Sequence, residues 1–211
     1  AARIPLKPVS KKCRMDIMLK NRKFKELTDE FKAEDIESWP GEENTVGEGF
    51  YYRGVTYLQL KDGPAAAKDL RKAVDYLTDD YSRGEAWMRL GEVCLNKLKD
   101  DNRALAAYRQ ALKAASAGGW IKNNSVITAA GILRKQGKYD EALRMLDNLD
   151  INMKGYWGIA LLSAHARTFA AQGKKAEAIA TFKKALGVKG INEAQKNAVQ
   201  KSLKALETGV K

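Results

Sequence analysis

The chain has 211 residues, 45% of them hydrophobic and 30% charged, and a net charge of +12. This is the composition of a folded globular protein, and no stretch approaches the roughly 20 uncharged apolar residues of a membrane-spanning helix, so we expect no span. Its single histidine and two scattered cysteines cannot assemble a zinc site of the usual spacing. We therefore expect no metal and no cofactor.

The positive charge is concentrated at the two ends of the chain. Residues 1–25 carry nine Lys or Arg and one Asp, and residues 183–211 carry seven Lys and two Glu, which leaves a net charge of −1 between them. Basic ends can contact nucleic acid or anionic lipid. They can also be the solvated surface of exposed terminal helices, and the sequence leaves both interpretations open.

The chain opens on Ala1 and Ala2 rather than on Met. Small residues suit the new N-terminus that a signal peptidase leaves, and this would place the protein in an exported or periplasmic compartment. A piece of a longer cytoplasmic chain could begin in the same way. The sequence therefore leaves the compartment open.

Residues 9–36 are predicted to form a degenerate pair of helices. On the first helix Met15 and Met18 face inward, and on the second Leu27 and Phe31 lie four residues apart, on one helix face. This pair precedes four longer segments with a clearer pattern.

The four segments cover residues 47–78, 84–116, 123–150 and 159–187. In the second half of each, a small residue recurs at spacings of 38, 38 and 36, and a large apolar residue follows it four positions later. Residues four apart lie on one face of a helix, so the small residue permits close approach and the large one fills the gap. The small residues are Ala66, Ala104, Ala142 and Ala178, and the large ones are Leu70, Tyr108, Leu146 and Phe182.

The first half of each segment predicts another helix, which precedes the helix just described and pairs with it. A bulky residue is followed four positions later by a small one and three further on by another bulky one, and the small residue marks where two helices touch. Glycines mark three of the turns between the paired helices. The second turn has none, and there Asn102 is predicted to cap the next helix. The small first-helix residues are Gly54, Gly91, Ala130 and Ala166.

Residues 192–207 are predicted to form a final helix that opens at Asn192. An array of helix pairs needs such a cap, because its last pair would otherwise expose its core face. The apolar stripe of this helix consists of Ala198, Val199, Leu203 and Leu206.

Together these segments resemble the tetratricopeptide repeat family, whose signature is Trp-x2-Leu-Gly-x2-Tyr followed by Ala, Phe and Ala. Residues 87–91, Trp-Met-Arg-Leu-Gly, and residues 137–142, Gly-Lys-Tyr-Asp-Glu-Ala, match it closely. The segments are longer than the family's usual length of about 34 residues. The resemblance implies an all-α fold, a right-handed superhelical solenoid of antiparallel helix pairs. It would form a single domain over residues 1–211 that ends in the capping helix.

The resemblance also implies a non-catalytic scaffold that binds a peptide or helix of another protein in a concave groove lined by the first helices. The alternative for each lining residue is packing between adjacent first helices. The alternative function is an electrostatic module whose basic ends contact nucleic acid or anionic membrane, and self-association is also open. Offsets from the small residues give the candidate groove residues Tyr51, Val55, Glu85, Met88, Glu92, Asn124, Ile127, Arg134, Ser163 and Arg167.

The residues present argue against two functions, the binding of chaperone tails and catalysis. The clamp by which some family members hold chaperone tails needs Lys and Asn one turn apart to bind two carboxylates, and no first helix of the four clear repeats carries that pair. No phosphate-binding loop or nucleophile–base pair is present, so we expect no catalysis. His165 and Cys94 take positions that face neighbouring helices, and Cys13 and Cys94 are either free thiols or one bridge.

Overall fold

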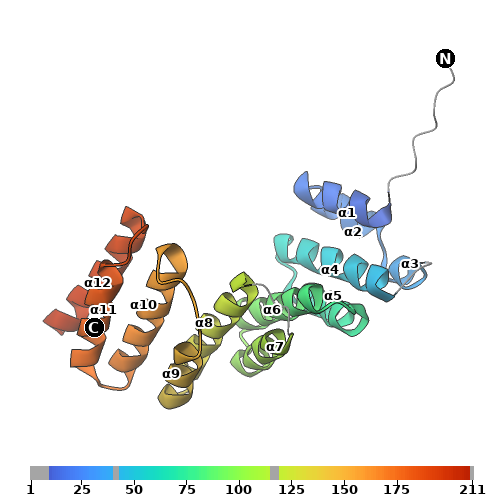
Figure 1. Ribbon diagram of the computed structural model, residues 1–211. Helices are drawn as coiled ribbons and strands as arrows, with labels where there is room; N and C mark the ends of the chain where they lie inside the picture. Colours follow the sequence, from blue (N-terminus) through green and yellow to red (C-terminus); the bar gives the residue numbers. More distant parts are fainter. Residues whose placement is uncertain (1–9, 40–42, 115–118, 210–211) are drawn as a thin grey trace. The chain divides into compact units, whose positions relative to one another are not determined.

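The computed structural model describes residues 10–39, 43–114 and 119–209, and these form helices joined by short connections (Figure 1). No strand occurs among the described residues, so the predicted all-α repeat fold is confirmed. The chain divides into two compact units, residues 1–118 and residues 119–211. A single solenoid domain over the whole chain stays a prediction.

Unit 1 begins with three short helices and continues with two antiparallel pairs, α4 with α5 and α6 with α7. The short helix α3 was not predicted from the sequence. Met15 and Met18 are buried as predicted, in one core with Leu27 and Phe50. The helices of unit 1 are α1 (Lys11–Lys20), α2 (Phe24–Glu30), α3 (Ala33–Glu37), α4 (Glu43–Gln59), α5 (Gly63–Tyr76), α6 (Asp80–Asn96) and α7 (Asp101–Lys113).

Unit 2 contains two further pairs and the capping helix. Asn192 begins that last helix as predicted, and its side chain and that of Gln195 form a reciprocal capping box. Val199 and Leu203 of the predicted stripe are buried against Phe182. The helices of unit 2 are α8 (Gly119–Lys135), α9 (Tyr139–Asp147), α10 (Gly155–Ala171), α11 (Lys175–Leu186) and α12 (Glu193–Thr208).

The small residues of the first helices lie where they were predicted, against the large residues of the second helices. A Cβ atom added at Gly54 would lie 2.8 Å from Cγ of Leu70, and one added at Gly91 would lie 3.0 Å from the ring of Tyr108. Leu70 and Tyr108 are almost completely buried. The absence of a side chain on one helix therefore sets how closely the pair packs.

The start of α7 differs from the prediction. Asp100, and not Asn102, is the N-cap residue, and its carboxylate accepts a hydrogen bond from the backbone N–H of Arg103. Lys99 has a left-handed backbone with φ of 55°, so a lysine takes the turn position that has no glycine, and α7 begins directly after Asp100. Asp62 and Asp79 cap α5 and α6 in the same way as Asp100 caps α7.

A buried ion pair joins both helices of the first clear repeat to the degenerate pair. Arg53 Nε donates to Asp69 Oδ2 at 2.6 Å and Arg53 Nη2 donates to Asp69 Oδ1 at 2.8 Å, while Nη1 donates to the Phe31 carbonyl at 3.2 Å. The two side chains are only 6% and 2% exposed. Burial alone would lower the pKa of Arg53, but the Asp69 carboxylate outweighs that effect and raises it. Arg53 is therefore held charged in the core by a bidentate partner.

Adding one methyl group at Gly54 should destabilise the protein. We expect Gly54→Ala to lower the free energy of unfolding by about 1–2 kcal/mol, because the contact with Leu70 can be relieved only by moving α4 from α5. Gly131→Ala is the matched control, since no atom lies within 4 Å of its added Cβ and alanine favours a helix interior by up to about 1 kcal/mol. Chemical denaturation measures both, and equal effects would contradict the close-packing argument.

Breaking the buried ion pair should cost more than breaking an exposed one. We expect Arg53→Gln to lower the free energy of unfolding by about 3–5 kcal/mol, because it leaves the Asp69 carboxylate buried without its partner. Arg14→Gln, which removes the exposed pair with Glu30, should cost no more than about 1 kcal/mol. Urea unfolding of the two variants, followed by circular dichroism, tests this ranking.

Candidate functional site

Three of the predicted groove residues of unit 1 belong to one polar cluster on α4 and α6. The Tyr51 hydroxyl donates a 2.6 Å hydrogen bond to Glu85 Oε1 on the neighbouring first helix. Arg89 Nη2 lies 3.7 Å from the same Glu85 oxygen, and Arg89 Nη1 donates to Glu92 Oε2 at 3.0 Å. We call Tyr51, Glu85, Arg89 and Glu92 the unit 1 cluster.

Burial and charge both act on the unit 1 cluster. Burial and the hydrogen bond to Glu85 raise the pKa of Tyr51 well above its usual range, so the hydroxyl remains a donor. Burial would lower the pKa of Arg89, but Glu92 and Tyr51 outweigh it and raise the value. Arg89 was missed by the sequence analysis. The sequence nevertheless contains an indication of these ion pairs. Arg89 stands four residues after Glu85 and three before Glu92, and side chains at these spacings are neighbours on one helix face.

A polar cavity of about 160 Å³ adjoins the unit 1 cluster and reaches α1. Lys12 and Glu48 form an ion pair at its wall, and Tyr51 and Glu85 complete the side near α6. The degenerate helix pair therefore contributes a side chain to the region that the sequence assigned to the groove. Lys12 was assigned to the basic N-terminal segment, and the structure gives it a carboxylate partner.

Two predicted groove residues are buried. Met88 is completely buried and Ser163 is 9% exposed, so neither presents a side chain to a partner. Both stand three positions before the small residue of their helix, as Tyr51 does, and Tyr51 reaches across to the adjacent first helix. At Met88 and Ser163 this burial favours packing between helices, which was the alternative interpretation for each lining residue, whereas Ile127 at the same offset on α8 is only half-buried. Val55 is half-buried on α4.

In unit 2 the predicted residues on α8 and α10 form a more basic surface. Ile127 is half-buried, and Asn124 accepts a 3.0 Å hydrogen bond from the Thr128 hydroxyl. Arg134 is half-buried and Arg167 is exposed. Burial, and then the positive charge of Arg167 on the packed helix α10, lower the pKa of Arg134.

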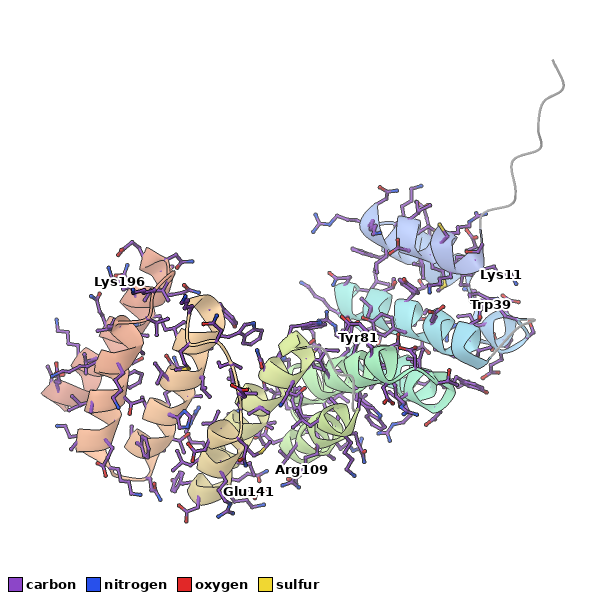
Figure 2. All side chains as sticks on the ribbon, in the orientation of Figure 1. Lys11, Trp39, Tyr81, Arg109, Glu141 and Lys196 are labelled. Carbon is purple, nitrogen blue, oxygen red and sulfur yellow. The ribbon has the colours of Figure 1, made fainter. Side chains whose placement is uncertain are left out.

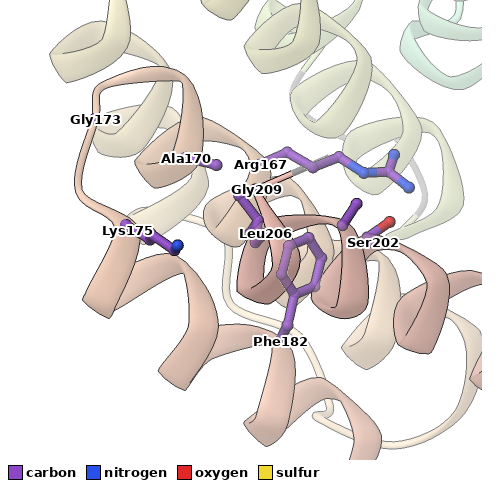
Figure 3. Close-up of a pocket in the computed structure, with 9 residues that line it drawn as sticks. Arg167, Ala170, Gly173, Lys175, Phe182, Ser202, Leu206 and Gly209 are labelled. Carbon is purple, nitrogen blue, oxygen red and sulfur yellow. The ribbon is translucent and has the colours of Figure 1, made fainter. Parts of the chain in front are cut away.

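Arg167 also lines a pocket of about 540 Å³ between α10, α11 and α12 (Figure 3). The wall of this pocket is mainly apolar and includes Ala170, Phe182 and Leu206. Lys175 adds a second cation, and no acidic residue lines the pocket among the described residues. We call it the unit 2 pocket.

The residues considered for catalysis or metal binding have structural contacts. The His165 ring lies 3.1 Å from the Leu161 carbonyl and 2.9 Å from Asp147 Oδ1. Cys94 is buried, and burial raises the pKa of its thiol, while Cys13 is exposed and both are free. Within the described ranges no cluster of three His, Cys, Asp or Glu could hold a metal, and no helix has the length and hydropathy to cross a membrane.

Comparison with known proteins identifies the family. A model of the tetratricopeptide repeat family matches residues 93–206, and a second model of this repeat matches residues 51–119. The chain belongs to the tetratricopeptide repeat family, whose members generally serve as non-catalytic scaffolds for protein–protein interaction. No curated protein matches the sequence.

Two solved structures share the fold. The C-terminal part of a repeat-containing protein from Cytophaga hutchinsonii has a TM-score of 0.69 at 13% identity, over 94% of this chain and 72% of that one. A variant of a Podospora anserina protein described as a kinesin light chain, with nearly identical repeats, has a TM-score of 0.64 at 14% identity, over 92% of this chain and all of that one. At such identities the likeness shows the fold alone.

The Tyr51 hydroxyl should make stability sensitive to alkaline pH. Its folded pKa is raised above the unfolded value near 10, so above that pH the unfolded chain releases a proton that the folded protein retains. The stability that the neutral hydroxyl contributes is complete below pH of about 10 and falls above it by up to about 1.4 kcal/mol per pH unit. We expect Tyr51→Phe to lose less stability than wild type between pH 8 and 11, as measured by urea unfolding. Tyr156→Phe, at a side chain 60% exposed, is the control and should follow wild type.

Proposed function

We propose that the chain is a non-catalytic scaffold that binds a peptide or helix of a protein partner on the faces of its first helices. The observation that supports this most is the grouping of first-helix residues from successive repeats. Tyr51 of α4 donates a hydrogen bond to Glu85 of α6 in unit 1, and in unit 2 the packed first helices α8 and α10 carry Arg134 and Arg167. A repeat array offers such neighbouring positions as an extended surface.

The two units offer opposite chemistry to a partner. The unit 1 cluster has two carboxylates and one guanidinium, and the adjoining cavity is polar. The unit 2 surface has two arginines and an apolar pocket. Charge of opposite sign on the partner would be complementary in each case, and such complementarity mainly provides specificity and speed of association. Val55 adds an apolar side chain to the surface of unit 1, and Ile127 adds one to the surface of unit 2.

The alternative of an electrostatic module with basic ends receives little support from α1 and the turn after it. Lys12, Arg14, Lys20 and Lys23 each pair with a carboxylate, and Lys11 lies 5.2 Å from the Trp39 ring centroid (Figure 2). Of the seven Lys and Arg residues between positions 11 and 25, all within the described part of the chain, only Arg22 and Lys25 have neither an ion pair nor an aromatic contact. Most of this charge is therefore paired within the chain, which reduces the field it offers to nucleic acid or lipid.

Site-specific photo-crosslinking in cells that express the protein tests the proposal. A photoreactive amino acid replaces Val55 on α4 or Ile127 on α8, and the matched controls replace exposed Gln110 on α7 or Arg144 on α9. We expect protein adducts at the first-helix positions and several-fold weaker ones at the controls, as quantified by mass spectrometry. Adducts only at the second-helix positions would contradict the proposal, and adducts to the chain itself would identify a second copy as the partner.

A further inference from the structure

The last three helices of unit 2, with the connections around them, carry most of the excess positive charge of the chain. Residues 151–209 contain ten Lys or Arg and three Glu, which gives a net charge of +7. Two of the three glutamates are paired, Glu193 with Lys196 at 3.3 Å and Glu207 with Lys183 at 3.6 Å. Unlike α1, where most cations have a carboxylate within the chain, this region therefore has far more cations than carboxylates to pair with them.

Three of these lysines line a second pocket of about 540 Å³ in unit 2. Lys154 lies directly before α10, Lys184 lies in the last turn of α11, and Lys189 follows α11. Within the described residues none of the three forms an ion pair, and no carboxylate lines the pocket. We call it the lysine pocket. The rest of its wall is mainly apolar and includes Met153, Leu162 and Val188.

The lysine pocket is formed by two connections that are far apart in the sequence. The backbone N–H of Gly155 donates a 2.8 Å hydrogen bond to the carbonyl of Lys189, and this bond joins the connection before α10 to the one after α11. A Cβ atom added at Gly158 would lie 2.7 Å from the carbonyl carbon of Met153, so the first connection also packs tightly on α10. The walls of the pocket are therefore held in place before a partner arrives, which lowers the conformational cost of binding.

Both the charged and the apolar side chains of the lysine pocket are accessible to a partner. The three lysines are exposed. Met153 is 44% exposed, and Leu162 and Val188 are half-buried, so each still offers apolar surface to solvent. A methionine side chain is flexible and adapts to apolar groups of different shape. The pocket therefore presents three cations and an apolar surface together.

We propose that the lysine pocket binds an acidic segment of a partner protein, in which one large apolar side chain enters the pocket and neighbouring aspartates or glutamates face the lysines. The inference rests on the proposed scaffold function and names the partner chemistry that unit 2 recognises where α10 begins. Complementary charge orients such a segment and speeds its association, and burial of the apolar side chain adds to its affinity.

The apolar wall favours a protein segment over other anions. Phosphates of a nucleic acid or of a lipid surface could face the lysines, but the sugars and headgroups beside them are polar and would leave Met153, Leu162 and Val188 without apolar contact. Among the described residues no aromatic side chain lines the pocket, so a base has no ring there on which to stack. The acyl chains of a bilayer lie beneath its headgroups, where side chains inside a recess do not reach them. A protein segment offers acidic and apolar side chains next to each other.

Selection from a peptide display library tests the inference directly. Random peptides of about a dozen residues are selected on the full chain, on a pocket variant, Lys154→Gln with Lys189→Gln, and on a matched variant, Lys201→Gln with Lys204→Gln. Both variants lose two positive charges from unit 2, but Lys201 and Lys204 lie on α12, outside the lysine pocket. We expect the full chain and the matched variant to enrich peptides with several Asp or Glu around one Leu, Ile, Phe or Met, and the pocket variant to lose that enrichment.

Binding of one selected peptide gives the magnitude. The Kd should rise about tenfold for the pocket variant, because two ion pairs with the peptide are lost, and about twofold or less for the matched variant. Replacing the apolar residue of the peptide with Ser should weaken binding to the full chain about tenfold or more. Thermal unfolding separates loss of binding from misfolding, because all four substituted lysines are exposed and both variants should keep the Tm of wild type.

Each other outcome would overturn the inference in a distinguishable way. Equal weakening in the pocket and matched variants would show attraction by net charge without a pocket. Phosphatidylserine vesicles or single-stranded RNA that bind the full chain but not the pocket variant, with no acidic peptide enriched, would assign the lysines to lipid or nucleic acid. Peptides without acidic residues, whose binding is lost in Ile127→Ala but kept in the pocket variant, would remove this site and leave the scaffold function. Failure to enrich any peptide would also overturn the inference, and the crosslinks at Val55 and Ile127 would then test the scaffold function separately.

Discussion

The close approach of two helices at one small residue determines the geometry of each repeat. Gly54 lets Leu70 pack against the backbone of α4, and Gly91 does the same for Tyr108 against α6. In unit 2 alanine replaces glycine at the equivalent positions, and Ala130 and Ala166 are still almost completely buried. Once this contact fixes the rotation of the first helix, residues at set offsets from it face the neighbouring first helix or solvent. The candidate binding residues depend on that rotation.

The turn inside each pair is the second constraint, and it relates the degenerate pair to the others. A residue with positive φ occurs at Arg22, Lys61, Lys99, Gly137 and Gly173, at spacings of 39, 38, 38 and 36. In four of the five turns the next N–H donates to a carbonyl five residues earlier, and after Lys99 the carbonyl is six earlier. This closes the end of the first helix in the manner of a Schellman motif. Unit 1 forms the turn with Lys and Arg, at a steric cost that glycine avoids in unit 2.

Features that depend on the periodicity of the sequence were predicted correctly. Features that depend on which of several possible partners a side chain contacts were not. The small and large residues of the paired helices, the inward methionines of α1 and the cap at Asn192 follow from local spacing, and the structure confirms them. The pairing of Arg53 with Asp69 joins different helices, and no spacing rule distinguishes Asp69 from other acidic residues. The burial of Met88 has the same origin, because the offset alone does not say whether it faces solvent or the next first helix.

Arg53 and Arg134 show two ways in which a first helix carries a guanidinium that is not fully solvated. Arg53 is buried and gains a bidentate carboxylate and a backbone carbonyl, so its hydrogen bonds are made within the chain. Removing it leaves the Asp69 carboxylate buried without a partner, which is why this arginine belongs to the stability of the fold. Arg134 is only half-buried, so its guanidinium can keep contact with water and needs no such partner. The degree of burial, which the spacing of the sequence does not give, therefore decides whether an arginine of a first helix requires a carboxylate.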